Sequence, residues 1–133
     1  MFNILIVEDD RNSRKLMEII LKTNGYEYFS VANGVQALEI LDNHQIDLII
    51  LDIMIPKMNG YELTKELRNN KINIPILMIT AKQLLEDKKK GFIAGTDDYM
   101  VKPVDEEEML LRIKALLRRA KIANEHQLII GKV

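Results

Sequence analysis

Short apolar runs alternate with amphipathic segments along almost the whole chain. Five of these runs predict strands, at residues 4–7, 28–31, 46–51, 76–80 and 98–101. After each run, apolar residues recur every three or four positions, which is the spacing of one helix face. Most of the runs are continuous rather than alternating, so we expect strands buried on both faces. The pattern predicts an α/β fold, a doubly wound five-stranded parallel sheet with helices on both faces.

Polar residues mark where some of the helices begin. Two capping boxes are expected, Asn33 with Gln36 and Asp105 with Glu108. The helix expected over residues 84–94 is weaker, since it is rich in lysine and only weakly apolar. We therefore expect this helix to be marginally stable and able to move.

Composition narrows the class of protein. A length of 133 residues with 47% hydrophobic and 29% charged residues fits one ordinary globular domain. The net charge of −1 gives no general attraction to nucleic acid, and the absence of cysteine excludes disulfides and thiolate metal sites. The chain becomes acidic within its first ten residues, unlike a signal peptide, and no apolar run approaches the roughly 18 residues of a membrane span. We expect a cytoplasmic protein with no membrane contact.

Four of the five strands are followed by chemically useful side chains at the sheet edge where such folds bind ligands. These are Glu8, Asp9 and Asp10 after the first strand, Asp52 at the end of the third, Thr80 at the end of the fourth and Lys102 after the fifth. Two carboxylates about 4 Å apart repel by roughly 4 kcal/mol at an effective dielectric constant near 20. Asp9 and Asp52, with Glu8 nearby, therefore carry more negative charge than Lys102 alone can balance. Oxygen ligands without imidazole or thiolate favour Mg²⁺ as the balancing cation.

Each of these residues also has an ordinary structural explanation. The acidic cluster could favour a helix N-terminus, Asp52 could accept backbone bonds in a turn, and Lys102 could simply be solvated. Their joint placement at one edge favours a site instead. A carboxylate beside a metal, a hydroxyl and an ammonium suits phosphoryl transfer, with Asp52 as the nucleophile. With no strong general base evident, we expect slow hydrolysis and hence a switch.

These residues lie in motifs that resemble the receiver domain of two-component response regulators over residues 3–120. The motifs are "ILIVEDD", "DLIILDIMIPKMNGYEL", "PILMITA", "AGTDDYMVKP" and "EEEMLLRIKALLRR". The resemblance implies a flavodoxin-like sheet of strand order 2-1-3-4-5 and a domain that spans residues 1–120. It also implies phosphorylation by a sensor histidine kinase, with no enzymatic activity beyond slow self-phosphorylation and self-dephosphorylation.

The resemblance assigns roles to individual residues. Asp52 is the implied phosphoacceptor. The implied Mg²⁺ ligands are Asp9, Asp52 and the backbone carbonyl of Met54, with Glu8 contributing to the acidic pocket through water. Thr80 and Tyr99 fall on the family's switch positions, and Lys102 on its phosphate-pairing lysine. The peptide bond between Lys102 and Pro103 is expected to be cis.

The resemblance narrows to the OmpR/PhoB-type transcription factors, whose active receivers dimerise through the fourth helix, fifth strand and fifth helix. The residues at the corresponding interface positions are Lys88, Asp97, Asp98, Glu108, Arg112 and Arg119. All six carry the expected sign of charge. The alternative is a solvated charged face, because exposed ion pairs contribute little free energy.

The tail, residues 121–133, loses the apolar helical stripe. We expect a linker or the start of a C-terminal winged-helix DNA-binding domain, with "LIIGKV" as its first strand. The chain is then a fragment, with a stand-alone receiver as the alternative, and DNA is contacted only through the missing domain. The basic cluster between Arg112 and Lys121 lacks interleaved aromatic residues, so we interpret it as helix surface and dimer contact.

Two other functions on this fold are disfavoured. A flavodoxin-like cofactor module needs glycines and hydroxyls after the first strand, where this chain has Glu8, Asp9 and Asp10. An aspartyl-phosphate phosphatase typically has a second acid two residues after its nucleophile, where this chain has Met54. The absence of a glycine-rich run ending in Gly-Lys-Ser/Thr excludes a P-loop enzyme.

Overall fold

The computed structural model describes residues 2–81, 89–90, 92 and 94–131, with side chains described as far as residue 123. In chain order the elements are β1 (Asn3–Val7), α1 (Arg11–Thr23), β2 (Glu27–Val31), α2 (Gly34–Asn43), β3 (Leu48–Asp52), α3 (Gly60–Asn69), β4 (Ile76–Thr80), β5 (Asp98–Val101) and α5 (Glu106–Gly131). The lysine-rich helix expected over residues 84–94 lies largely outside the described residues, including Lys88.

The five strands form one parallel sheet in the order β2-β1-β3-β4-β5, as predicted. All five residues of β3 and all five of β4 are buried, which is why these runs are continuously apolar. Because every strand runs in the same direction, the residues that follow β1, β3, β4 and β5 meet at a single edge.

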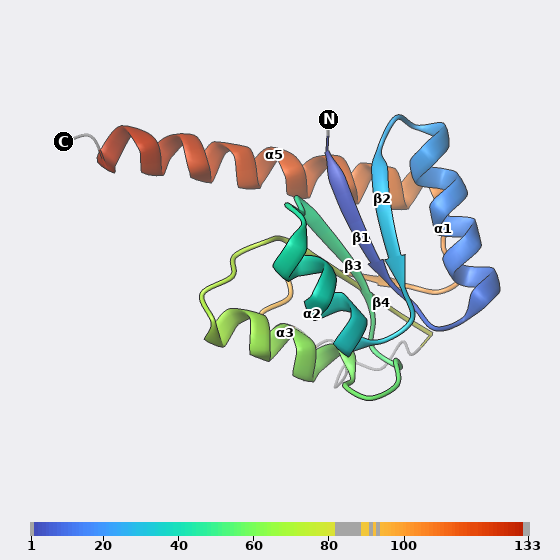
Figure 1. Ribbon diagram of the computed structural model, residues 1–133. Coiled ribbons are helices and arrows are strands. Elements are labelled where there is room, and N and C mark those ends of the chain that lie inside the picture. The colour runs from blue at the N-terminus through green and yellow to red at the C-terminus, as the bar shows by residue number, and fades with distance from the viewer. Residues whose placement is uncertain (1, 82–88, 91, 93, 132–133) are drawn as a thin grey trace.

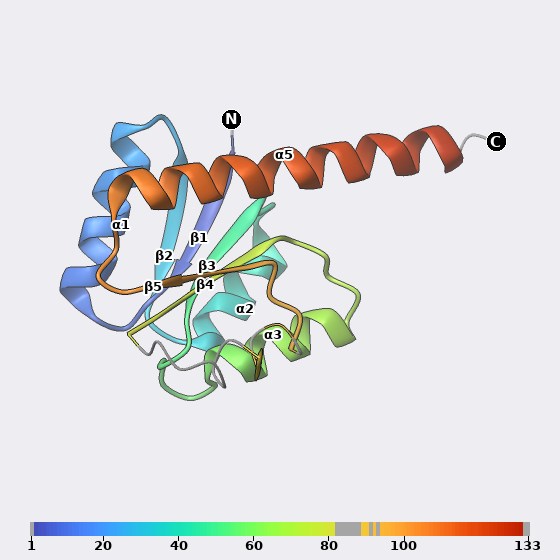
Figure 2. The same cartoon turned by 180° about the vertical axis from the view of Figure 1, so that it is seen from behind.

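Helices cover both faces of the sheet. Figure 1 shows α2 and α3 together on one face, and Figure 2, from behind, shows α5 and α1 on the other. Successive residues of a strand point to opposite faces, so Ile4 packs with Met17 of α1 and Ile113 of α5. Leu5 packs in the second cluster, which contains Leu63 of α3. The two apolar layers hold the sheet edges, and therefore the site, in fixed positions.

The capping boxes are confirmed only in part. The Asn33 side chain accepts a hydrogen bond from the Gln36 amide at 2.9 Å, but the Gln36 side chain accepts from Ala32 rather than from Asn33. Asp105 likewise accepts from the Glu108 amide at 2.8 Å, while the Glu108 carboxylate binds Arg112. In both places the side chain that would complete the box bonds another group instead.

A complete capping box stands at α3 instead. The Asn59 side chain accepts from the Glu62 amide at 2.9 Å, and the Glu62 side chain accepts from the Asn59 amide at 3.2 Å. Two otherwise unpaired backbone donors are thereby satisfied at the start of the helix that follows the loop from Asp52.

The last helix is longer than predicted. The backbone of α5 continues to Gly131, so the expectation of a strand at "LIIGKV" is wrong for residues 128–131. Residues 121–130 contain neither proline nor glycine, and extending a helix already anchored by its core contacts avoids the cost of nucleation. The second half of α5 projects past the rest of the domain (Figure 2). In the described part of the chain, no helix is both long enough and apolar enough to cross a membrane.

Candidate functional site

Three carboxylates meet at the carboxyl edge of the sheet, as the sequence predicted. Glu8 and Asp9 follow β1, and Asp52 is the last residue of its neighbour β3. One carboxylate oxygen from each residue lies within 4.8 Å of the other two. Glu8 and Asp52 are buried, with 0% and 5% of their surfaces exposed, whereas Asp9 is exposed. The cluster is therefore closed toward the core and open toward solvent at Asp9.

The ammonium of Lys102 joins two of these acids. Its Nζ lies 2.6 Å from Glu8 Oε1 and 2.6 Å from Asp52 Oδ2. The Lys102 amide donates to the Thr80 carbonyl at 2.7 Å, which extends the pairing of β5 with β4. The bond between Lys102 and Pro103 is cis, as predicted. Among the described residues, one ammonium thus pairs with two of the three carboxylates, so the cluster retains excess negative charge when all are ionised.

The buried, negatively charged surroundings change the pKa of Glu8. Burial, and after it the Asp52 carboxylate, raises the pKa of Glu8 from 4.5 to about 7, and the Lys102 ammonium opposes the rise. Burial alone would lower the pKa of Lys102, but its hydrogen bonds to Asp52 and Glu8 outweigh this and raise the pKa above its ordinary value. Lys102 is therefore firmly cationic, and Glu8 is the group that holds or releases a proton near neutral pH.

The loop after β3 also contacts Asp52. The backbone N–H of Met54 donates to Asp52 Oδ1 at 2.9 Å, and the Met54 side chain is 62% exposed. Gly60 closes the loop, since its N–H donates to the Ile53 carbonyl at 2.9 Å. A Cβ at Gly60 would lie 2.8 Å from the Asp52 carbonyl oxygen and 2.8 Å from Ile53 Cα, so α3 can begin this close to the site only with glycine.

The two predicted switch residues lie on neighbouring strands. Thr80 ends β4, is fully buried and pairs in register with Val101. Tyr99 of β5 is buried in the apolar cluster that β5 shares with α2 and α3. The structure thus brings Asp52, Lys102 and Thr80 to adjoining strand ends, with Tyr99 on the same strand that leads to Lys102.

The predicted dimer residues mostly pair within the protomer. Arg112 bonds both carboxylate oxygens of Asp98, at 2.9 and 3.0 Å, and Glu108 at 3.1 Å. Asp97 pairs with Arg68 of α3 at 2.8 Å and also accepts from the Ile76 amide. Arg119 is exposed, and Lys88 lies outside the described residues.

Two structural roles at the site, and one ion pair outside it, were not assigned from the sequence. Asp10 belongs to the N-cap of α1 rather than to the acidic cluster, since its side chain accepts from the Ser13 amide at 2.8 Å and this lowers its pKa. Arg14 donates to the Glu8 carbonyl at 3.0 Å and fixes the start of the loop. The Asp10-x-x-Ser13 spacing could have signalled the cap, but no sequence pattern indicates the Arg14 contact or the Arg68 pair.

Known proteins are similar to this chain in both sequence and fold. The sequence profile of the response regulator receiver domain matches residues 4–114. The chain belongs to this family. It is 38% identical over 133 residues to the heme response regulator HssR of Staphylococcus epidermidis, covering all of this chain and 59% of that protein. It is 42% identical over 120 residues to the alkaline phosphatase synthesis transcriptional regulatory protein PhoP of Bacillus subtilis, covering 90% of this chain and 50% of that protein.

These relatives are OmpR/PhoB-type regulators, and the chain spans between half and three fifths of their length. Solved receiver domains share its fold. The Francisella response regulator 1452 receiver has a TM-score of 0.86 and 29% identity, covering 90% of this chain and 99% of that one. The receiver of the Pseudomonas aeruginosa sensor histidine kinase PA1611, solved with a magnesium ion in its active-site cleft, has a TM-score of 0.80 and 31% identity, covering 87% and 97%.

Proposed function

We propose that this receiver domain accepts a phosphoryl group on Asp52 from the phosphohistidine of a sensor histidine kinase, in a Mg²⁺-dependent reaction that switches a transcriptional output. The observation that carries this proposal is the pairing of Asp52 Oδ2 with the Lys102 ammonium inside a three-carboxylate cluster. As in response regulators generally, the exchange would take place in the cytoplasm.

The transfer uses groups that the chain already positions. The Asp52 carboxylate attacks phosphorus, the new O–P bond forms as the N–P bond to the kinase histidine breaks, and the imidazole leaves with the electron pair. Oδ1 is held by the Met54 N–H, so Oδ2 is the oxygen we assign as nucleophile. Its partner, the Lys102 ammonium, can shift from Oδ2 to a phosphoryl oxygen and neutralise the charge that arrives.

The donor set fits Mg²⁺. Carboxylate oxygens from Glu8, Asp9 and Asp52 converge without imidazole or thiolate, and Asp9 is open to solvent. We assign Asp9, Asp52 and the Met54 carbonyl as ligands, with Glu8 acting through water. When bound, Mg²⁺ would supply the positive charge that lets the acidic cluster approach an anionic phosphoryl group. The magnesium ion in the PA1611 receiver supports this assignment.

The phosphorylated state is read out at β4 and β5. We assign the Thr80 hydroxyl as a donor to the new phosphoryl group, which draws the end of β4 toward Asp52. Tyr99 lies on the adjoining strand within the same apolar cluster, so its packing responds to that movement. The face that follows, formed by β5 and α5, would then pair with the same face of a second protomer.

The longer protein is inferred from the relatives. Because the chain covers only part of the PhoP and HssR sequences, we propose that α5 leads from the receiver toward a DNA-binding effector domain. Residues 121–133 would be the connection, and phosphorylation would act on DNA only through that domain.

The central test is covalent. Incubating the protein with acetyl phosphate and Mg²⁺ should add one phosphoryl group, measured by intact mass, and EDTA should prevent the addition. Asp52→Asn should abolish it. The matched control is Asp42→Asn, which removes an exposed carboxylate of α2 and should leave the addition unchanged. An adduct that persists in Asp52→Asn would refute the assignment of the phosphoacceptor.

A further inference from the structure

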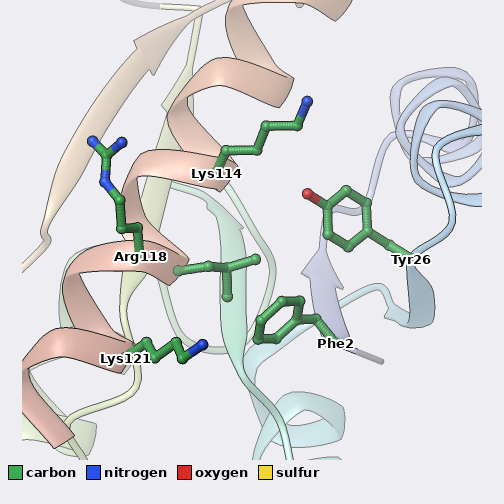
Figure 3. A pocket seen from close by; sticks show the side chains of 6 residues that line it. Phe2, Tyr26, Lys114, Arg118 and Lys121 are labelled. Atoms are coloured by element: carbon green, nitrogen blue, oxygen red, sulfur yellow. The ribbon is translucent and has the colours of Figure 1, made fainter. Parts of the chain in front are cut away.

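A hollow of about 220 Å³ lies at the opposite edge of the sheet from Asp52. Its lining residues are Phe2, Tyr26, Lys114, Leu117, Arg118 and Lys121. Phe2 precedes β1 and Tyr26 precedes β2, so the hollow lies where the parallel strands begin, beneath α5 (Figure 3). It therefore shares no residue with the phosphoacceptor site.

The floor and walls of the hollow are apolar. Leu117 is buried in the core, Tyr26 packs against the same core cluster, and Phe2 leaves 42% of its surface exposed. Figure 3 shows the Tyr26 and Phe2 rings on one side and α5 on the other. An exposed phenylalanine beside an open apolar floor can bury further surface only if something enters the hollow.

Cations line the α5 side. Lys114, Arg118 and Lys121 follow one another at intervals of four and three residues, so they lie on successive turns of α5 and extend over about 10 Å. Lys114 and Lys121 extend on the side of α5 that faces the two rings, while Arg118 points the other way (Figure 3).

These cations are not neutralised in the described part of the chain. None of the three forms an ion pair there, whereas Arg112, on the same helix, has two acidic partners. Glu27 follows Tyr26, and Asp47 accepts a hydrogen bond from the backbone N–H of Asn3 beside Phe2, but neither carboxylate pairs with these cations among the described residues. Within the part of the chain whose side chains are described, the positive charge around the hollow thus has no acidic partner.

We propose that this hollow docks an acidic segment of a partner protein, which inserts one aromatic or large aliphatic side chain between α5 and the rings of Phe2 and Tyr26. Carboxylates on either side of that side chain pair with Lys114 and Lys121. The apolar contact supplies affinity, and the charges select acidic over basic segments.

Size and shape favour a protein segment over other anions. Pockets that enclose whole small molecules usually measure about 300–1,000 Å³, so this open hollow is suited to one side chain of a larger partner. A membrane surface accepts apolar side chains that project from a protein, whereas this site is concave. The basic cluster lacks aromatic neighbours along the chain, but folding places Phe2 and Tyr26 beside it.

The experiment uses the whole 133-residue chain and a fluorescent probe. The probe is a short acetylated peptide with one central phenylalanine flanked on both sides by glutamates. Fluorescence anisotropy at about 50 mM salt, where exposed charges are weakly screened, should show saturable binding. Replacing the central phenylalanine by alanine, or the glutamates by lysines, should abolish it.

Protein variants locate the binding. Lys114→Glu combined with Lys121→Glu should weaken binding by about tenfold or more, since two attractive charges become repulsive. Lys15→Glu combined with Lys65→Glu makes the same net charge change at two exposed lysines outside the hollow and should leave binding nearly unchanged. Phe2→Ala should weaken binding without any change of charge, and Asp52→Asn should have no effect.

Equal losses in the two double variants would mean that only net charge matters, and would overturn the proposal. So would an unchanged affinity in both Phe2→Ala and the Lys114/Lys121 variant. Phenylacetate and phosphatidylglycerol vesicles serve as further probes. Binding of either one without binding of the peptide would assign the hollow to a small anion or to lipid, and would equally overturn a protein partner.

Discussion

Among single residues, Lys102 connects the stability of the site to its function. Its ammonium pairs with both Glu8 and Asp52, and it lies where the proposed phosphoryl group would arrive. The same contact stabilises two buried carboxylates, and in the proposed reaction it would be exchanged for a contact with the phosphoryl group. Since the cluster keeps excess negative charge, part of the folding free energy is spent to hold these carboxylates together.

Glu8 should therefore make stability depend on pH. Its folded pKa, raised mainly by burial from 4.5 to about 7, lies above the unfolded value, so its contribution is full below about pH 4.5 and is lost as pH rises through 7. Between about pH 5 and pH 8 in EDTA, the free energy of unfolding should fall relative to Glu8→Gln by about 2 kcal/mol. Urea unfolding of both proteins across this range measures the difference, and parallel curves would contradict it.

Among the elements, α3 begins in close contact with the end of β3. The N-terminus of α3 is fixed by the Asn59–Glu62 capping box, and Gly60 allows its first turn to touch the backbone of Asp52 and Ile53. The position of Asp52 therefore depends on a helix that contributes no side chain to the acidic cluster.

Gly60→Ala tests this dependence. The new Cβ would meet backbone atoms 2.8 Å away, so either α3 or the Asp52 loop must shift. We expect a loss of about 1–3 kcal/mol in the free energy of unfolding, typical of overpacking, together with slower phosphorylation by acetyl phosphate.

Gly25→Ala is the matched control. Gly25 has a φ of +84° but no atom within 4 Å of the added Cβ, and it lies at the end of α1 away from the site. It should lose stability through backbone strain alone and keep the wild-type rate of phosphorylation. If both variants were phosphorylated at the same rate, the α3 contact would have no role in positioning Asp52.

The elements were predictable from sequence to different degrees. The continuous apolar runs correctly predicted that β3 and β4 are buried within the sheet. The proximity of Asp52, Lys102 and the acidic residues could also be predicted, because the carboxyl ends of parallel strands meet at one edge of the sheet. The length of α5 was not predictable from its apolar stripe, since an anchored helix continues through residues that would not start one.

Long-range polar contacts were the least accessible to sequence reasoning. Arg68 of α3 bonds Asp97, the Gly95 carbonyl and the Ile72 carbonyl, and thereby ties α3 to the loops on either side of β4. Nothing in the local pattern around Arg68 indicates those partners, because they lie up to 29 residues away along the chain. The local sequence is therefore the same whether an arginine on a helix is solvated or bonds distant parts of the chain.

At the scale of the whole molecule, we propose different tasks for the two ends of the sheet. The carboxyl edge holds Asp52, the proposed phosphoacceptor, and the opposite edge holds the basic hollow beneath α5. The β5–α5 face connects them, and its charges are the ones predicted to join two protomers. In the single protomer Asp98 already bonds Arg112, so a dimer must exchange or share this pair.

A charge exchange at Asp98 and Arg112 can separate pairing within a protomer from pairing between protomers. With Mg²⁺ and a beryllofluoride phosphate mimic, light scattering of the wild type should report a dimer. Asp98→Arg alone and Arg112→Asp alone should each weaken dimerisation by about tenfold or more, because each leaves like charges facing one another across the interface.

Mixing these two single variants should restore dimers. The introduced arginine of one variant would face the introduced aspartate of the other, and the native Arg112 of the first would face the native Asp98 of the second. Neither protomer regains its internal pair in the mixture, so recovery can come only from contacts between chains. Lys65→Asp, on an exposed position of α3, is the control that should dimerise like the wild type. If the mixture stayed monomeric, the Asp98–Arg112 pair would act only within the protomer. If each single variant dimerised fully, the interface would lie on another face.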